Sequence, residues 1–262
     1  MIAESGLVAR LRAAGCVFAE DEARLLVEAA GERGGLEAMV RRRVAGLPLE
    51  QVVGWTEFRG RRVVLAEGVF VPRRRSEFLA GRAVAAAEAV AARASGVVVL
   101  DLCCGVGAVG AAVAAEVAGV ELHAADLDPA ALACARRNVA GAVYEGDLYA
   151  PLPASLRGRV DVLVANAPYV PTGELELLPA EARLYEPRAA LDGGADGLDV
   201  QRRIAAGAAQ WLAPGGTLLI ETSGRQEDRT VEAFRRAGLR TRVARCEDLA
   251  ATVVEGTGEA GA

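Results

Sequence analysis

The chain has 262 residues, and 52% of them are hydrophobic, which suffices for one large packed domain or for a domain with a small appendage. All 30 basic residues are arginine and the net charge is −5 at pH 7, a balance that argues against a protein that wraps nucleic acid. Because the sequence has neither a signal-peptide pattern nor a run of about 18 apolar residues, we expect a cytoplasmic protein that does not contact a membrane.

The N-terminal part of the chain is expected to be helical. Apolar residues recur at helical spacing over residues 5–46, and glycines divide this segment into three short helices. These helices offer few apolar positions, so we expect them to share a core with the segment that follows. In that segment, residues 55–58 and 62–65 are typical of a β-hairpin, and residues 69–71 are a further extended run.

Strands and helices alternate from residue 76 onward. The first helix is predicted from Ser76, as its N-cap, to Arg93. Repeated β-α-β units then predict a doubly wound, Rossmann-like α/β sheet with right-handed crossovers. The seven predicted strands are residues 97–102, 120–125, 142–145, 160–165, 217–221, 240–245 and 251–255. Helices are predicted at residues 109–117, from Asp128-Pro129, at 199–212 and at 226–237, and a long loop at 167–198.

The candidate cofactor site is the loop that follows the first strand of this sheet. It reads Asp101-Leu102-Cys103-Cys104-Gly105-Val106-Gly107-Ala108-Val109-Gly110. Ligands of open α/β sheets bind beyond the carboxyl ends of the strands, and glycines let the backbone approach a ligand closely. The spacing also matches the Gly-x-Gly-x-x-Gly dinucleotide fingerprint. That motif alone is weak, and it leaves a nicotinamide or flavin oxidoreductase as an alternative.

Aspartates at three successive strand ends favour S-adenosylmethionine over a dinucleotide. Asp101 precedes the glycines, where a dinucleotide site prefers no charge but a cationic sulfonium with an amino-acid tail tolerates one. Asp126 ends the next strand, at the distance expected for a hydrogen bond to ribose hydroxyls. Asp147 ends the strand after it and is suited to accept from an adenine amino group. Aspartates commonly end strands, but this plainer interpretation suits one such acid better than three.

A second candidate site is Asn166-Ala167-Pro168-Tyr169, after the fourth strand. An amide or exocyclic nitrogen is a poor nucleophile because its lone pair is delocalised. An asparagine oxygen and a backbone carbonyl can accept from both N–H groups of such a nitrogen and turn its lone pair toward a methyl donor. Pro168 stiffens the turn, Tyr169 offers a flat face to a planar target, and catalysis would rest chiefly on positioning. For the tetrapeptide alone, an ordinary strand-ending turn is the alternative.

Over nearly its whole length the sequence resembles the protein-(glutamine-N5) methyltransferases, whose best-known members modify the Gly-Gly-Gln glutamine of peptide chain release factors. The most specific shared segment is Tyr185-Glu186-Pro187-Arg188-Ala189-Ala190-Leu191-Asp192-Gly193-Gly194-Ala195-Asp196-Gly197-Leu198. The other shared segments are Trp55-Thr56-Glu57-Phe58, Val71-Pro72-Arg73, Asp101–Gly107, Asp126-Leu127-Asp128-Pro129, Gly146-Asp147-Leu148-Tyr149, Pro214-Gly215-Gly216 and Glu221.

The resemblance implies a class I methyltransferase fold in three parts, and it assigns roles to residues. It implies a helical substrate-docking domain at residues 1–50, a β-hairpin linker at 51–75 and the S-adenosylmethionine-dependent domain at 76–262. The residues implied to bind S-adenosylmethionine, or its product S-adenosylhomocysteine, are Asp101, Cys103, Cys104, Gly105, Val106, Gly107, Asp126, Leu127, Asp147, Leu148 and Asn166. Those implied to hold the glutamine amide are Asn166, Ala167, Pro168 and Tyr169, with Asn166, Pro168 and Tyr169 as catalytic residues. The implied partner is a protein that carries the glutamine, such as a release factor.

The sequence departs from the family pattern at three places, so we expect a divergent paralogue. The family tetrapeptide is Asn-Pro-Pro-Tyr, and Ala167 replaces its first proline. The usual Pro-Arg-Pro-Glu-Thr-Glu-like segment reads Pro72-Arg73-Arg74-Arg75-Ser76-Glu77. Cys103 replaces the first glycine of the cofactor loop.

A different methyl acceptor, an exocyclic amine of a nucleic-acid base, remains open because enzymes of that kind use a similar tetrapeptide. Arg41-Arg42-Arg43 and Arg73-Arg74-Arg75 would then contact phosphates. The acidic net charge argues against this acceptor, and charge runs of this kind usually form solvated faces. The five cysteines form no Cys-x-x-Cys pair and the chain has a single histidine, so no metal site is expected.

Overall fold

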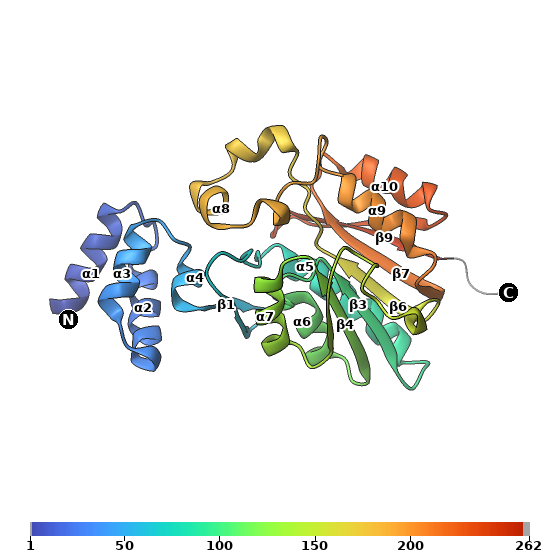
Figure 1. Ribbon diagram of the computed structural model, residues 1–262, viewed down its shortest axis with the longest axis horizontal. Helices are drawn as coiled ribbons and strands as arrows, with labels where there is room; N and C mark the ends of the chain where they lie inside the picture. The colour runs from blue at the N-terminus through green and yellow to red at the C-terminus, as the bar shows by residue number, and fades with distance from the viewer. Residues whose placement is uncertain (1, 259–262) are drawn as a thin grey trace.

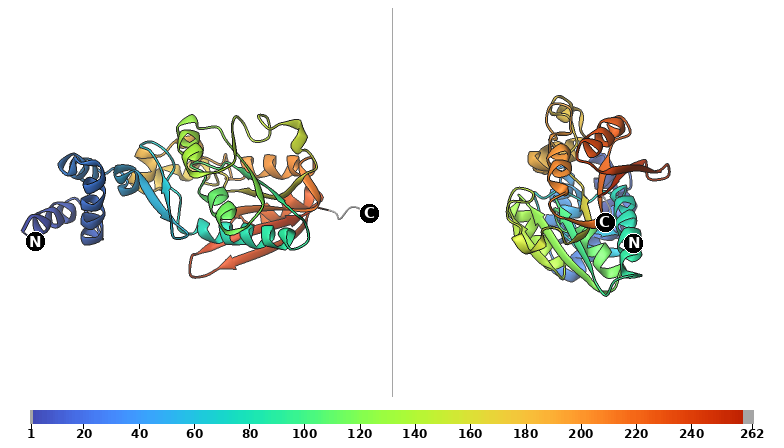
Figure 2. Two further views of the ribbon diagram at one scale, coloured as in Figure 1. Left: turned by 90° about the horizontal axis from the view of Figure 1, so that it is seen from below. Right: turned by 90° about the vertical axis from the view of Figure 1, so that its right-hand side faces the viewer.

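The computed structural model places a seven-stranded sheet, with helices on both faces, beside a group of N-terminal helices (Figure 1). It describes residues 2–258, and the side chains of all of these except residues 2–4, 32 and 33. Figure 2 shows that the N-terminal helices form one end of the molecule. In the described part of the chain, no helix combines the length and the apolar character that crossing a membrane requires.

The N-terminal helices pack into a hydrophobic cluster that is separate from the apolar layers of the sheet. They are α1 (Ile2–Ala13), α2 (Ala19–Arg33), α3 (Leu36–Val44) and the short α4 (Leu49–Val53). Leu11 and Leu26 are fully buried between them. As predicted, these helices share their core with the segment that follows residue 46. Leu47, Val52 and Val53 are buried in the same cluster, and Trp55 and Tyr185 pack against it.

A hairpin connects the helices to the sheet, as predicted. Its strands are β1 (Trp55–Phe58) and β2 (Arg61–Val64), paired antiparallel. The extended run expected at residues 69–71 is not a strand. Its backbone polar groups bond to side chains instead: Val69 accepts from the amide of Gln51, and Val71 donates to the carboxylate of Glu186.

The strand order of the large sheet distinguishes it from a dinucleotide-binding fold. The order is β5-β4-β3-β6-β7-β9-β8, and β9 is antiparallel to both neighbours. A dinucleotide-binding sheet is mostly parallel with order 3-2-1-4-5-6, so here the last strand is inserted in reverse between the fifth and the sixth. The strands are β3 (Val97–Leu102), β4 (Val120–Asp126), β5 (Ala142–Glu145), β6 (Val160–Ala165), β7 (Leu212–Thr222), β8 (Arg240–Cys246) and β9 (Ala251–Thr257).

Each face of the sheet carries its own apolar layer, because successive side chains of a strand point to opposite faces. Val97 and Val99 of β3 pack with one group of helices, and Val98 and Leu100 pack with the other. The first group is α5 (Ser76–Ala91), α6 (Ala108–Glu116) and α7 (Pro129–Asn138). The second group is α9 (Asp199–Ala208) and α10 (Glu227–Arg236).

The long loop predicted at residues 167–198 contains three short helices. They are η2 (Thr172–Leu177), α8 (Ala180–Tyr185) and η3 (Arg188–Ala190), and one further 3-10 turn, η1 (Ala154–Leu156), lies between β5 and β6. Pro171, Pro179 and Pro187 directly precede the three. Proline fixes φ near the helical value and so favours a helical turn at the residues that follow. These prolines are the sequence feature that could have predicted the three short helices.

Other predicted element boundaries were wrong near residue 212. The helix expected at 199–212 ends at Ala208, and the strand expected at 217–221 begins at Leu212. Strand β7 therefore runs through the Pro-Gly-Gly segment, where its register with β6 shifts between Val160 and Val162. Proline and glycine are depleted in strands, and an irregularity of this kind is where a strand tolerates them.

Candidate functional site

A cleft of about 380 Å³ opens where the parallel strands β3 to β6 end. Two cleft-lining glycines, Gly105 and Gly146, follow β3 and β5. Of the residues expected to bind a cofactor, those in the cleft lining are Cys103, Gly105, Asp126, Leu127, Asp147, Leu148 and Asn166. The other lining residues, apart from Pro168, had no predicted site role: Gly68, Phe70, Ala125, Asp128, Ala131, Gly146, Pro187, Ala189, Ala190, Val200 and Arg203.

The glycine loop is held to the cleft by Asp126. One oxygen of its carboxylate accepts from the Gly105 amide at 2.8 Å, and the other accepts from the Asp128 amide at 2.9 Å. Burial raises the pKa of Asp126, and these backbone hydrogen bonds oppose the rise. Gly105 has φ of 53°, in the left-handed region, and a Cβ atom there would meet nothing within 4 Å. The cleft floor at this point is bare backbone.

Asp101, Cys104, Val106 and Gly107 lie outside the lining of this cleft. The carboxylate of Asp101 is buried and accepts from the Gly110 amide at 2.9 Å, so it ties the first turn of α6 to the end of β3. Burial raises the pKa of Asp101 from 3.8 to about 7. The Gly110 hydrogen bond lowers the pKa, and the nearby charge of Asp126 raises it further.

Asp101 should make the stability of the protein fall as the pH rises from about 4 to about 7. In that window an unfolded chain has already released this proton while the folded chain, with a pKa of about 7, still holds it. Asp101→Asn keeps an acceptor for Gly110 but does not titrate. Its free energy of unfolding, relative to the wild type, should increase across the window by about 2–4 kcal/mol. Urea unfolding of both proteins at pH 4.5 and pH 8 measures this, and a constant difference would contradict it.

Asp147 is paired with a residue that sequence reasoning missed. Its carboxylate accepts from Arg203 of α9 at 2.6 Å, and both residues line the cleft. The two are 56 positions apart, and no local pattern connects them. One carboxylate oxygen of Asp147 is therefore engaged, which restricts how the carboxylate can meet a bound ligand.

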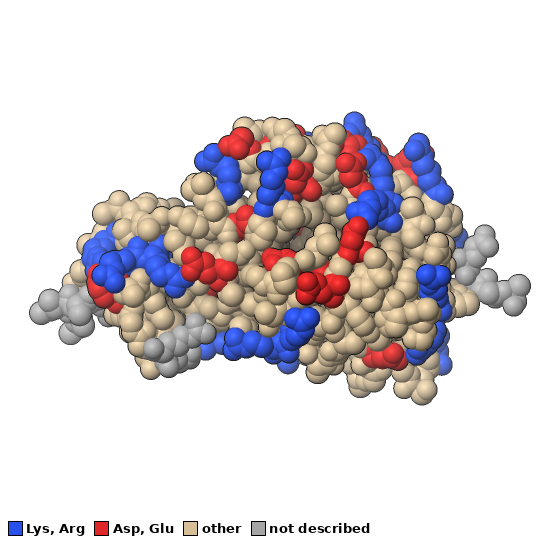
Figure 3. Space-filling view, in the orientation of Figure 1, with Lys and Arg blue, Asp and Glu red and all other residues tan. Residues whose placement is uncertain are grey.

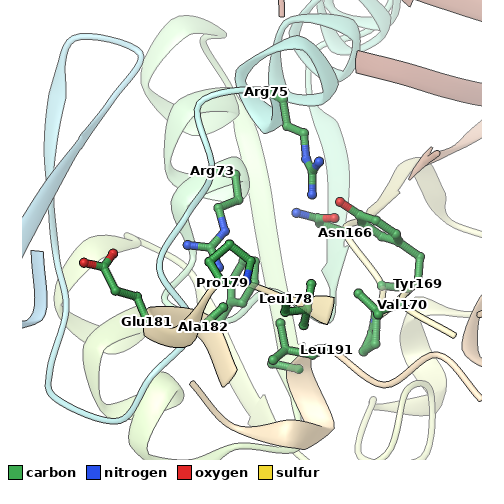
Figure 4. Close-up of a pocket in the computed structure, with 14 residues that line it drawn as sticks. Arg73, Arg75, Asn166, Tyr169, Val170, Leu178, Pro179, Glu181, Ala182 and Leu191 are labelled. Atoms are coloured by element: carbon green, nitrogen blue, oxygen red, sulfur yellow. The ribbon is translucent and has the colours of Figure 1, made fainter. Parts of the chain in front are cut away.

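A second cavity, of about 530 Å³, adjoins the cleft. Asn166 and Pro168 line both spaces, together with Phe70 and Ala190, and therefore form the wall between them. Figure 4 shows Arg75, Asn166 and Tyr169 converging on one side of this cavity. The rest of the lining comes from the segment before α5, from the turn after β6 and from the segment of short helices: Arg73, then Ala167 and Val170, then Leu178, Pro179, Glu181, Ala182 and Leu191.

The amide of Asn166 has a fixed direction. Its Nδ2 donates to the hydroxyl of Ser76 at 3.0 Å, which leaves Oδ1 as an acceptor without a donor from the described residues. The carbonyl of Ala167 also accepts no hydrogen bond from the described part of the chain. The prediction of Ser76 as an N-cap was wrong. Arg75 holds the N-cap position. Ser76 is the first residue of α5, and its hydroxyl accepts from the side chain of Asn166.

The glycines of the segment that follows support the Asn166–Tyr169 turn from behind. A Cβ atom on Gly193 would lie 2.7 Å from the carbonyl oxygen of Pro168, and one on Gly197 would lie 2.3 Å from that of Tyr169. The amide of Gln226 donates to the Tyr169 carbonyl at 2.9 Å and to the Asp196 carbonyl at 3.0 Å. Only glycine fits between these backbones, which gives the Asp192–Leu198 segment its structural role.

Glu186 fixes the other wall of the second cavity. It is buried, and it pairs with Arg73, whose guanidinium lies 4.7 Å over the ring of Phe70. Gln51 donates to the carbonyls of Val69 and Tyr185 and so joins the hairpin segment to α8. Phe70 lies directly before the Val71-Pro72-Arg73 motif, and this adjacency was the signal that could have identified it.

Four of the six arginines in the two runs form ion pairs with described carboxylates. Figure 3 shows basic and acidic side chains interspersed on the face that it displays. The pairs of the runs are Arg42 with Glu67, Arg43 with Glu22 and Glu181, Arg73 with Glu186, and Arg75 with Glu221. Arginines that already have carboxylate partners offer little to phosphates, which argues against a nucleic-acid acceptor. Among the described side chains, no group of three or more His, Cys, Asp or Glu could hold a metal ion.

Known proteins resemble this chain in sequence. The family described as "Methyltransferase small domain" matches residues 85–194. A release factor glutamine methyltransferase of Geobacter sulfurreducens is 37% identical, with 79% of this chain and 72% of the relative covered. A 4-amino-L-phenylalanine/4-methylamino-L-phenylalanine methyltransferase of Streptomyces pristinaespiralis is also 37% identical, with 76% of this chain and 69% of the relative covered.

The fold also matches solved structures. A ribosomal protein L11 methylase from Lactobacillus delbrueckii subsp. bulgaricus superimposes with a TM-score of 0.53 at 14% identity, covering 75% of this chain and 85% of that one. At this identity the match concerns the fold. Together with the reversed strand β9 and the methyltransferase family match, it identifies the sheet as that of a class I methyltransferase. The relative from Geobacter sulfurreducens, at 37% identity, argues against the dinucleotide-dependent alternative.

Proposed function

The chain belongs to the release factor glutamine methyltransferase family and is an S-adenosylmethionine-dependent enzyme, and from that premise we propose its acceptor. The acceptor is the side-chain amide nitrogen of a glutamine in a protein, either a peptide chain release factor or a related protein, which implies a cytoplasmic location. One observation carries this proposal. Two oxygens that accept no hydrogen bond from the described residues face the second cavity: Oδ1 of Asn166, at its border with the cleft, and the carbonyl of Ala167.

The residues of the cleft fit S-adenosylmethionine, which when bound supplies a methyl group on an electrophilic sulfonium. The bare backbone at Gly105 leaves room for close approach, and Asp126 stands at the strand end with lone pairs suited to ribose hydroxyls. We assign Cys103, Leu127 and Leu148 to the walls of this site. Asp147 acts as a pair with Arg203, and Asp101 supports the loop from beneath without touching the ligand.

The acceptor side works by positioning. A glutamine amide that enters the second cavity donates one N–H to Oδ1 of Asn166 and the other to the carbonyl of Ala167, which turns its lone pair toward the cleft. Pro168 and Tyr169 confine the planar amide. As the new C–N bond forms and the carbon–sulfur bond breaks, the nitrogen becomes more acidic and releases one proton to water. A strong base is not needed for this step.

We further propose that residues 1–50 dock the acceptor protein, that 51–75 link the two parts and that 76–262 carry the chemistry. The helical part contacts the wall of the acceptor cavity: Arg43 pairs with Glu181, and the Tyr185 hydroxyl donates to the Ala45 carbonyl at 2.9 Å. A protein bound to these helices would therefore lie beside the cavity. The linker contributes Phe70 directly to the cavity lining.

A small aromatic amine that carries an amino-acid group is the second candidate acceptor. The observation that favours it is the relative whose name specifies 4-amino-L-phenylalanine, which matches this chain at the same identity as the first relative does. An aryl amine, like an amide, is planar with a delocalised lone pair. The same two oxygens of the turn would hold it.

A labelling experiment separates the acceptors. The purified protein is incubated with radiolabelled S-adenosylmethionine in four parallel reactions. The acceptors in the first two are a bacterial release factor made in cells that lack the endogenous enzyme, and the same factor with asparagine in place of the glutamine of its Gly-Gly-Gln motif. The acceptors in the other two are nucleic acid and 4-amino-L-phenylalanine. Label that is confined to the unaltered release factor supports the proposal. Label in 4-amino-L-phenylalanine would instead support the aromatic amine as the acceptor. Label that nuclease removes would support an exocyclic amine of a nucleic-acid base as the acceptor.

A further inference from the structure

We propose that Glu221 is the positioning residue of the acceptor site, acting on Asn166 through Ser76 and on Tyr169 through Arg75. This inference rests on the proposed function, because it gives the acceptor-holding residues their orientation. Glu221 lies at the end of β7, one position beyond the pair formed by Ile220 with Ala165, and so beside Asn166.

Glu221 needs an explanation because it is buried with little support. Its side chain is 2% exposed, and neither carboxylate oxygen completes a hydrogen bond within the described part of the chain. Its ion pair with Arg75 is the one charge that offsets its burial among the described residues. A buried carboxylate with so little compensation is strongly destabilising, so it calls for a reason. Ser76 and Arg75, both at the start of α5, lower the pKa of Glu221 against the rise that burial causes.

The first series of contacts runs from Glu221 through Ser76 and fixes the direction of the Asn166 amide. The Ser76 hydroxyl accepts from Nδ2 of Asn166, and its single proton is left for the Glu221 carboxylate, whose pKa Ser76 lowers. If the amide were turned around, Oδ1 would need that same proton, and Glu221 would lose it. The carboxylate therefore selects the orientation in which Oδ1 faces the acceptor cavity.

The second series of contacts runs from Glu221 through Arg75 and holds Tyr169. Nε of Arg75 lies 3.2 Å from a carboxylate oxygen of Glu221, and the guanidinium carbon lies 5.2 Å from the centre of the Tyr169 ring. Figure 4 shows Arg75 reaching toward Asn166 and Tyr169 across the edge of the cavity. A guanidinium that is anchored by a carboxylate on one side stacks on an aromatic face with less loss of side-chain entropy.

Glu221 cannot act as the base, because both of its oxygens are buried and it lies outside the lining of either cavity. Its effect reaches the acceptor only through the two side chains that it orients. Replacing a residue of this kind should lower turnover far more than cofactor affinity. Turnover should fall when a hydrogen bond is reversed as well as when one is lost.

The test compares three variants of the full-length protein. Glu221→Gln replaces an acceptor by a side chain that can donate to Ser76, which turns the serine proton toward Asn166 and favours the flipped amide. We expect a fall in kcat of about 100-fold, as for a misplaced reacting group. Ser76→Ala should give a comparable fall, whereas Ser76→Thr, which keeps the hydroxyl, should stay within about threefold of the wild type. Affinity for S-adenosylhomocysteine should change by less than about threefold in all three, since none lines the cleft.

Two further measurements make the outcome decisive. Thr222→Val is the matched control, since Thr222 is the next buried polar residue on β7 and bonds to Thr230 instead of the acceptor site. It should leave kcat unchanged. The side-chain amide signals of Asn166 in a ¹⁵N NMR spectrum should shift in Glu221→Gln and Ser76→Ala but not in the control. Unchanged amide signals in Glu221→Gln, or a Ser76→Thr enzyme as slow as Ser76→Ala, would overturn the proposal. If the wild type methylates no glutamine, the proposed acceptor fails, and the amide signals still decide the role of Glu221.

Discussion

Asn166→Ala should lower kcat for methyl transfer by about 100–1,000-fold, the loss seen when one preorganised polar contact to the reacting group is removed. The variant takes away Oδ1, one of the two acceptors of the second cavity that have no donor among the described residues, and leaves the carbonyl of Ala167. The target nitrogen could still bind, but its lone pair would no longer be turned toward the methyl donor. Because most of the cleft lining is untouched, affinity for S-adenosylhomocysteine should change by less than about fivefold.

Steady-state formation of S-adenosylhomocysteine gives kcat for this variant, and isothermal calorimetry gives the affinity. Asn166→Asp is the informative companion. This variant keeps an oxygen that can accept a hydrogen bond from the target amide. It loses the Nδ2 donor to Ser76, and it brings a second carboxylate close to Glu221. Its kcat should lie between those of the wild type and the alanine variant. An alanine variant with normal turnover, or one that loses affinity for S-adenosylhomocysteine as steeply as it loses turnover, would remove Asn166 from the role assigned to it.

The parts of the fold that sequence predicts well are those with local causes. Strand β3 opens with four consecutive apolar residues, Val97–Leu100, because both of its faces are covered, and such a run is visible without a structure. The start of α7 was predicted from Asp128 and Pro129, and the Asp128 side chain does cap it by accepting from the Ala130 amide. The reversed strand β9 could not be derived in this way, because strand order depends on contacts between segments that lie far apart in the chain.

The same distinction applies to the two cavities. The sequence places Asn166 and the glycine loop at strand ends, and strand ends of a parallel sheet meet at one edge, so their proximity was predictable. The partners that set their geometry were not. Ser76 is 90 positions from Asn166, and as the first hydroxyl of a helix it has the sequence pattern of a cap. Glu221 was noticed only through the family resemblance, because one acid at the end of a strand has many explanations.

Replacing the two glycines of the cofactor loop one at a time should separate binding from folding. At Gly105→Ala the new methyl meets nothing within 4 Å of the protein and stands at the cleft lining. At Gly107→Ala it would lie 2.8 Å from Cγ1 of Val139 and 3.4 Å from Cβ of Ala135, inside the core. Both residues have positive φ, so both alanines carry a strain of about 1–2 kcal/mol.

The first variant should therefore mainly weaken ligand binding, and the second should mainly lower the stability of the fold. Gly105→Ala should weaken binding of S-adenosylhomocysteine by tenfold or more, about 1.4 kcal/mol or more, with little loss of stability beyond the backbone strain. Gly107→Ala should lower the free energy of unfolding by about 2–4 kcal/mol, because overpacking adds to the strain, and should bind nearly normally once folded. Calorimetric titration and urea unfolding of the same samples measure both quantities. If Gly105→Ala binds as the wild type does, the ligand does not lie against this loop, and the cofactor site must be placed elsewhere along the strand ends.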